Sequence, residues 1–213
     1  FMQRVPVFAS MQKVQTLAVM YYRPYAWEAY MTSDRHVSVG GYILGQTYRN
    51  FKRLYAALMK LNCDPGIIDL WTNPEHITRF QMVFVPCSVY MDSNAQQLLM
   101  DYVASGGNVV FCPAPPRLDL DLNPNSLFSV YAWRDQNGHT DSSPRQYKIG
   151  KGKIMELDMT AVSDDSKQTK LELEMLRTVL MQFNVMSEVQ INEPNVMAVL
   201  HRNGTNKVLF LIN

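Results

Sequence analysis

The chain has 213 residues, of which 47% are hydrophobic and 18% are charged, and its formal net charge is +1. This composition supplies a real hydrophobic core and excludes an intrinsically disordered chain. The near-neutral charge, without a basic cluster, gives no support to a nucleic-acid-binding or membrane-binding surface. No apolar run approaches the roughly 20 residues that a membrane-spanning helix needs.

Three cysteines, Cys63, Cys87 and Cys112, leave at least one thiol unpaired. Each is next to an apolar segment, where a cysteine usually acts as a small buried hydrophobe. Neither a disulfide framework nor a metal site is expected, because the spacing of Cys and His fits no metal-binding pattern. Free thiols favour the cytoplasm. A periplasmic or secreted protein whose signal peptide had been removed would look the same, so localisation stays open.

Residues 82–111 predict a complete β-α-β unit, around which the rest of the chain is organised. Residues 82–85 are a short, fully apolar run that is typical of a strand buried on both faces. Asp92 or Ser93 can cap the following helix, which a glycine pair ends. Residues 109–111 then begin a second buried strand. A crossover this short joins parallel strands, so we expect a parallel sheet.

Two more strands and a helix precede this unit. Residues 16–21 and 67–71 predict strands, and residues 48–61 carry apolar side chains at helical spacing with most basic side chains opposite. The glycines within residues 40–45 indicate a flexible approach to that helix. Asn73 opens a turn or short helix.

After the unit, a proline-rich run at residues 112–117 excludes regular structure and opens a polar loop that extends to residue 146. Loops of this length are more often functional or interfacial than idle. Gly150 and Gly152 predict a hairpin, and an apolar stripe from residue 171 to residue 183 predicts a last long helix.

The order of these elements predicts a flavodoxin-like, three-layer α/β sandwich with a mostly parallel sheet. Residues 1–13 are interpreted as an incoming linker, residues 14–186 as the α/β domain, and residues 187–213 as the start of a small antiparallel β domain. The chain opens on Phe1 and closes on an apolar run with nothing after it to pair, so we expect it to be part of a larger protein.

A catalytic cysteine is one candidate site. An exposed nucleophile after a strand needs a tight elbow flanked by glycines. Cys87 has Pro86 and Ser88 as neighbours instead, and Cys112 precedes a proline. A buried structural thiol is the better interpretation of both.

Carboxylates and glycines give weaker signals. Asp119 and Asp121, or Glu28 with another acid, could form the carboxylate pair that glycoside hydrolysis uses. Alternating acids in a loop more often face solvent or cap a turn. The glycines within residues 40–45 match neither a phosphate-binding loop nor a dinucleotide fingerprint.

The aromatic stretch at residues 21–30 follows the first strand, where sheets of this type have their ligand crevice. Pro24 takes the chain out of strand geometry. The nearby side chains could stack on a sugar or hold a partner subunit, and packing inside the protein explains the aromatic residues equally well. An interface is favoured over a small-molecule site. The residues concerned are Arg23, Tyr25, Trp27 and Glu28.

Several segments together match one known family. The most specific match is residues 83–86 with Leu98, Leu99 and residues 102–107, and it is joined by residues 17–22 with Trp27, residues 48–61 with 67–70, and residues 150–153. On these residues the chain resembles the glutamine-amidotransferase-like (class I) trimerisation domain of family forty-two β-galactosidases and related multidomain exo-acting glycosidases. Residues 14–186 are covered, and residues 209–213 resemble the start of that family's small C-terminal β domain. Residues 112–119 are richer in proline than the family pattern.

The resemblance implies a parent enzyme whose catalytic glutamates lie on a TIM barrel N-terminal to this chain. It also implies a domain that lacks amidotransferase activity and helps to hold subunits together beside the active site. The expected partners are that barrel, further copies in a dimer or trimer, and a carbohydrate as a further option. No catalytic, metal-binding or cofactor-binding residue is carried over. The interface or pocket-rim candidates are Arg23, Tyr25, Trp27, Glu28, Trp71, Arg117 and Asp119.

Two alternatives stay open. One is a free-standing amidotransferase-like enzyme that acts through Cys87 or Cys112. The other is a sugar-binding module that uses Trp27 and Trp71.

Overall fold

The computed structural model describes residues 11–31, 38–39, 42–43, 46–124, 127–128, 145–158, 165–189, 191 and 196–212. The strands are β1 (Gln12–Lys13), β2 (Leu17–Tyr21), β3 (Ser38–Val39), β4 (Tyr42–Ile43), β5 (Gly66–Asp69), β6 (Met82–Pro86), β7 (Asn108–Cys112), β8 (Arg145–Ile149), β9 (Gly152–Glu156), β10 (Met197–Asn203) and β11 (Asn206–Ile212). The helices are α2 (Arg23–Met31), α3 (Gln46–Lys60), the 3₁₀ helix η2 (Pro74–Arg79), α4 (Ser93–Ser105) and α6 (Asp165–Gln182).

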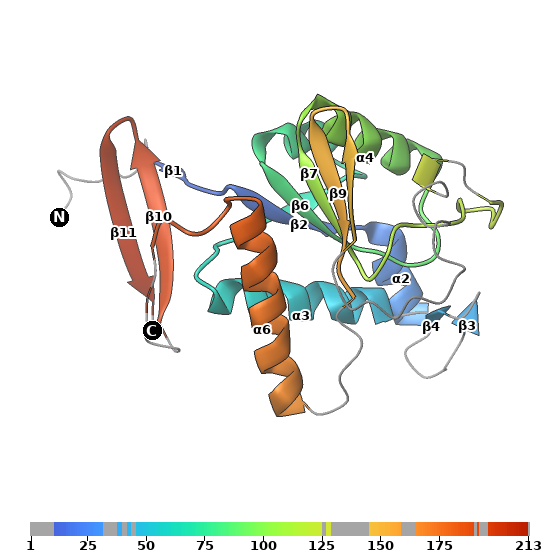
Figure 1. The fold of residues 1–213 in the computed structure, drawn as a ribbon, viewed down its shortest axis with the longest axis horizontal. Helices are drawn as coiled ribbons and strands as arrows, with labels where there is room; N and C mark the ends of the chain where they lie inside the picture. Colours follow the sequence, from blue (N-terminus) through green and yellow to red (C-terminus); the bar gives the residue numbers. More distant parts are fainter. Residues whose placement is uncertain are drawn as a thin grey trace.

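The main sheet has six strands in the order β5-β2-β6-β7-β9-β8 (Figure 1). Every neighbouring pair is parallel except β8 and β9, which form the predicted antiparallel hairpin. Taken in chain order, the five parallel strands follow the 2-1-3-4-5 arrangement of flavodoxin-like folds. The predicted fold class is confirmed.

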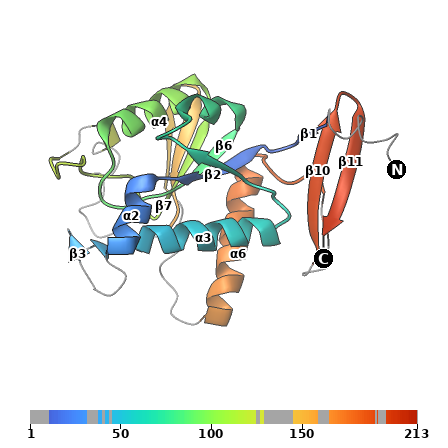
Figure 2. The same cartoon turned by 180° about the vertical axis from the view of Figure 1, so that it is seen from behind.

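Helices cover both faces of this sheet. Figures 1 and 2 show α4 on one face and α3 with α6 on the other. Because successive side chains of a strand point to opposite faces, the fully buried strand β6 contributes side chains to two separate hydrophobic cores. Val83 and Val85 pack toward α4, and Met82 and Phe84 pack toward α3 and α6.

The turns around α4 follow from their sequence. The Asp92 carboxylate accepts a hydrogen bond from the Ala95 backbone N–H at 2.8 Å and caps the helix, as predicted. Gly106 ends the helix at a φ of 125°, which favours glycine. Gly152 is required for another reason: a Cβ there would lie 2.0 Å from the carbonyl oxygen of Gly107, the residue just before β7.

The aromatic stretch after β2 leaves strand geometry at Pro24, as expected, and forms a helix, α2, that the sequence did not indicate. Pro24 is the second residue of this helix, where the missing N–H has no helical partner to lose. The segment before α3 also contains β3 and β4, which pair antiparallel. The glycines that predicted flexibility there lie outside the described residues.

A second sheet of three strands has the order β1-β10-β11, with both pairs antiparallel (Figure 1). The antiparallel β structure expected near the end of the chain is therefore present. Its third strand, β1, comes from the segment predicted to be a linker. Val189 and Ile191, which were expected in a strand, are outside any strand. The domain boundaries at residues 13/14 and 186/187 stay predictions.

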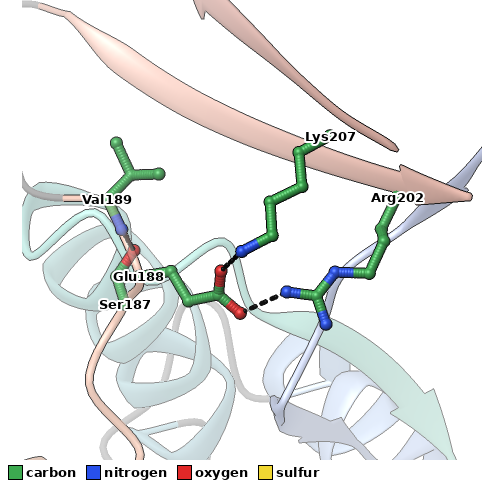
Figure 3. Close-up of polar contacts among 5 residues, drawn as sticks. All are labelled: Ser187, Glu188, Val189, Arg202 and Lys207. Carbon is green, nitrogen blue, oxygen red and sulfur yellow. Dashed lines mark hydrogen bonds and ion pairs between the residues drawn. The ribbon is translucent and has the colours of Figure 1, made fainter. Parts of the chain in front are cut away.

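Charged contacts hold this small sheet to the segment that leads into it. The Glu188 carboxylate lies between the Arg202 guanidinium, at 2.7 Å, and the Lys207 ammonium, at 2.6 Å (Figure 3). Lys13 pairs with Asp64 at 2.8 Å, and the Asn62 amide donates to the Ile191 carbonyl at 3.2 Å.

Among the helices that the structure describes, none has the length and apolar character to cross a membrane.

Candidate functional site at the carboxyl edge of the sheet

The natural position for a ligand in this fold is between β2 and β6. From these neighbouring strands the chain crosses in opposite directions, to β5 and to β7. Open α/β sheets bind ligands in the crevice outside the carboxyl ends of such strands. The aromatic stretch lies there, as predicted, because α2 begins two residues after Tyr21 ends β2.

Three tyrosines fill this crevice, and we call Tyr22, Tyr25 and Tyr90 the tyrosine cluster. The Tyr22 and Tyr25 rings meet edge to face with centroids 4.7 Å apart, and the Tyr25 and Tyr90 rings do so at 5.5 Å. Such geometry adds to the stabilisation from buried area. The pocket that Tyr22 and Tyr25 help to line beside β2 has about 10 Å³ of free space, which is enough for about one water molecule and no organic ligand.

Each tyrosine hydroxyl also has a polar partner. Tyr22 donates to the Asp92 carboxylate, Tyr90 donates to the Glu28 carboxylate, and Tyr25 donates to the Tyr90 carbonyl. Burial raises the pKa of all three hydroxyls, so they stay protonated donors. The crevice is therefore closed by satisfied polar groups as well as by ring volume.

Cys87 lies beneath the cluster and is not an active nucleophile. It is buried, and its sulfur lies 3.5 Å from the Tyr25 hydroxyl oxygen. Burial raises the pKa of the thiol to about 12, although its hydrogen bond with the Tyr25 hydroxyl lowers it in part. Cys112 is also buried, with its pKa raised mainly by burial. At neutral pH neither thiol forms the thiolate that attack requires.

The predicted site residues do not gather on one surface. Tyr25 and Glu28 are buried, and both take part in the hydrogen bonds of the tyrosine cluster. Their place at an interface stays a prediction. Arg23 lies 3.9 Å from Asp69, and Trp27 is 59% exposed on the outer side of α2.

Asp119 organises its own loop. Its carboxylate accepts backbone hydrogen bonds from Asp121 and Asn123, both at 2.9 Å. This is the turn-capping role that was weighed against catalysis, and it accounts for the alternating acids. Arg117 is exposed at the start of the same loop.

Trp71 does line a groove, together with residues that the sequence did not indicate. The Trp71 groove has a volume of about 450 Å³ and lies beside the tyrosine cluster. Its walls come from the end of β5, the start of η2, the first turns of α4 and the loop after β7. They consist of Leu70, Trp71, Pro74, Asp92, Asn94, Ala95, Leu98 and Leu120. No local signal could have found this set, because only the tertiary fold brings the four segments together.

No group of three His, Cys, Asp or Glu side chains within the described ranges could hold a metal ion. The expectation that the protein uses no metal or cofactor remains a prediction.

Comparison with known proteins supports the resemblance seen in the sequence. The family described as GLMA-like, second domain, matches residues 43–194. A β-galactosidase from Bacillus circulans sp. alkalophilus superimposes with a TM-score of 0.72 and 13% identity over 100% of this chain and 37% of that one. A catalytic mutant of a GH42 β-galactosidase from G. stearothermophilus gives a TM-score of 0.65 and 11% identity over 94% of this chain and 34% of that one.

A β-1,2-glucosyltransferase from Ignavibacterium album is 22% identical over an alignment that spans 247 positions, gaps included. The alignment covers 92% of this chain and 34% of the relative. The chain thus spans about a third of the length of the proteins it matches. At these identities the solved structures establish the fold, and the family match extends over more than half of the chain. The chain belongs to the GLMA-like second-domain family and has the α/β fold found in family forty-two β-galactosidases.

Proposed function

We propose that this chain is a non-catalytic accessory domain of a β-galactosidase-like glycoside hydrolase and that it contributes to contacts between subunits. The observation that carries the proposal is the closed crevice between β2 and β6. The tyrosine cluster occupies the position where this fold would bind a substrate, and the pocket beside β2 has about 10 Å³ of free space. A domain whose expected ligand site is filled by its own side chains is better suited to assembly than to catalysis.

The names of the relatives support the proposal that this domain is part of a longer enzyme that acts on glycosides. Two are β-galactosidases and one is a β-1,2-glucosyltransferase, and each is about three times as long as the part that this chain matches. We therefore propose that the longer protein to which this domain belongs acts on glycosides. We further propose that its catalytic residues lie on a barrel outside this chain, which is the domain's first partner.

The proposed contact surface is the outer side of α2, which we call the α2 face. Trp27, Tyr30 and Met31 are 59%, 82% and 76% exposed, and their spacing of three and four residues places them on one side of the helix. Large aromatic and methionine side chains are enriched in protein interfaces. Three of them in contact with water on one short helix favour a protein partner over solvent.

Mass in solution tests this role. The 213-residue chain and its Trp27→Ala and Met31→Ala variants would be measured by light scattering over a range of concentrations. We expect the parent chain to form a dimer or trimer and each variant to shift toward monomer, because truncating a central interface side chain typically costs about 1 kcal/mol or more of binding free energy.

Met181→Ala is the matched control. Met181 is 64% exposed, on α6 and away from α2. The Met181→Ala substitution should leave the mass of the chain in solution unchanged. Circular dichroism should show that all variants stay folded. A parent chain that is monomeric at every concentration would contradict an autonomous assembly role.

Thiol titration separates this proposal from the cysteine-enzyme alternative. Because Cys63, Cys87 and Cys112 are buried and each has a raised pKa, we expect no rapidly reacting thiol in the native chain at neutral pH. All three should react once the chain is unfolded. One thiol that reacts rapidly in the folded state would favour the enzyme.

A further inference from the structure

The Trp71 groove differs from the closed crevice beside it, because it is open and its volume is that of a ligand site. Small-molecule sites generally enclose roughly 300–1,000 Å³ and combine apolar walls with a few polar groups. At about 450 Å³, with six apolar and two polar residues in its lining, this groove has both properties.

Trp71 is held in a fixed position at the groove wall. Its backbone N–H donates to the Asp69 carboxylate at 2.9 Å, and the same carboxylate accepts from the Thr72 hydroxyl at 2.7 Å. The Tyr22 ring backs the indole, with centroids 6.3 Å apart, and 47% of Trp71 stays exposed. A half-exposed aromatic side chain fixed by its turn and by a second ring is a preorganised stacking surface.

The polar groups of the groove suit a ligand with hydroxyls and no charge. Asp92 is the one charged residue in the part of the lining that the structure describes, and its carboxylate already accepts from the Tyr22 hydroxyl and the Ala95 N–H. Each carboxylate oxygen has a second lone pair, so Asp92 can still accept from a ligand hydroxyl. Asn94 is exposed on the first turn of α4 and offers both an amide donor and an acceptor.

Charge complementarity therefore disfavours an anionic ligand, because among the described residues no cationic side chain lines the groove and Asp92 alone carries a formal charge. A fully apolar ligand would cover the Asn94 amide and the remaining lone pairs of the Asp92 carboxylate without offering them a hydrogen bond. A pyranose ring meets both conditions, since it has an apolar C–H face for Trp71 and hydroxyls at its edge.

We propose that the Trp71 groove binds a neutral carbohydrate, with one sugar ring stacked on Trp71 and its hydroxyls bound to Asp92 and Asn94. The choice of β-linked sugars as ligands rests on the proposed function. The position of the site and the exclusion of anionic ligands rest on the groove alone.

The test is a titration of the isotope-labelled 213-residue chain with the β-linked disaccharides lactose and cellobiose, followed by NMR. We expect a saturable shift of the Trp71 indole N–H resonance at millimolar sugar. Trp71→Ala should weaken binding by about tenfold or more, and Asn94→Ala by less. Met181→Ala is the matched control, because Met181 is 64% exposed on α6 and lies outside both the groove lining and the α2 face, and it should leave the affinity unchanged.

Three outcomes would overturn the proposal: no saturable shift with either sugar, binding that survives Trp71→Ala in a folded variant, or shifts of the groove resonances that depend on protein concentration without sugar. The last would assign the groove to a second copy of the chain. Light scattering on the same samples keeps this test distinct from that of the assembly role, because a chain that fails to bind sugar can still associate through the α2 face.

Discussion

The six-stranded sandwich and the three-stranded sheet bury their apolar side chains in different ways. Every residue of β6 in the sandwich is buried, and helices cover both faces. In β11 the four consecutive apolar residues from Leu209 to Ile212 are each at least 41% exposed, although they alternate between the faces of the sheet. The sandwich thus has its own core, and the described part of the small sheet has too little apolar packing to form one.

The ion pairs of the two regions also differ in burial: the sandwich has a buried pair and the small sheet has exposed ones. In the sandwich the Arg53 guanidinium of α3 pairs with Glu172 of α6, and Glu172 is 5% exposed. In the small sheet Glu188 pairs with Arg202 and Lys207 at the surface (Figure 3). Burial makes a broken ion pair costly, whereas water compensates for a broken pair at the surface. Stability should therefore depend mainly on the sandwich.

The largest expected difference in stability is between two Phe→Ala substitutions, one in each region. Phe84→Ala removes a fully buried ring from β6 and should lower the free energy of unfolding by about 3–5 kcal/mol. Phe210→Ala removes a ring that is 41% exposed and should cost less than about 1 kcal/mol. Urea denaturation followed by circular dichroism measures both.

If Phe84→Ala does not fold, Phe84→Leu provides the smaller step, with an expected loss of about 1–2 kcal/mol. Equal losses for Phe84 and Phe210 would mean that the small sheet has a core as tightly packed as that of the sandwich.

The second effect concerns the ion pairs. Arg53→Ala leaves the Glu172 carboxylate buried without its cation and should cost about 1–3 kcal/mol, a range reduced from that of fully buried pairs because the Arg53 side chain is 34% exposed. Arg202→Ala leaves the exposed Glu188 with Lys207 and should cost less than Arg53→Ala does. High salt should reduce the second loss more than the first. The opposite order in urea denaturation would reject this part of the comparison.

The smallest effect is a pH dependence confined to the small sheet. The hydrogen bond from Lys207, assisted by the charge of Arg202, lowers the pKa of Glu188 in the folded chain. Its contribution is therefore fully present above the ordinary carboxyl pKa and is lost as the pH falls through the lowered value. Amide protection in β10 and β11 should decrease over that window more than protection in β6.

Glu188→Gln should remove this difference, because glutamine does not titrate. Protection that falls equally in the variant would assign the pH effect to other groups.

Local patterns in the sequence predicted most of the sandwich. The apolar run of β6, the Asp92 cap and the glycines after α4 act over a few residues, so each can be recognised without the fold. β1 could not be predicted, because Gln12 and Lys13 have no pattern of their own and become a strand only by pairing with β10. α2 was missed because a proline and three aromatic residues among nine obscured its helical spacing.

The candidate site was less predictable than the fold. The position of the aromatic stretch at the end of β2 followed from topology. Burial, however, depends on the opposite wall, and Tyr90 is 65 residues away from Tyr25 in the sequence. The sequence therefore could not distinguish Tyr25, which faces inward, from Trp27, which faces outward. The Trp71 groove needs four segments at once, and no single one of them indicates a cavity.

The pairing of β1 with β10 also gives the chain the topology of an inserted module. Lys13 lies opposite His201, and the Val14 N–H donates to the Leu200 carbonyl at 2.9 Å, so the chain enters and leaves the sandwich at adjacent points. A tight hairpin from β1 to β10 could, in geometric terms, replace everything between them. Recombination could therefore exchange the whole sandwich between proteins through two neighbouring breakpoints, while the strands on either side kept their register.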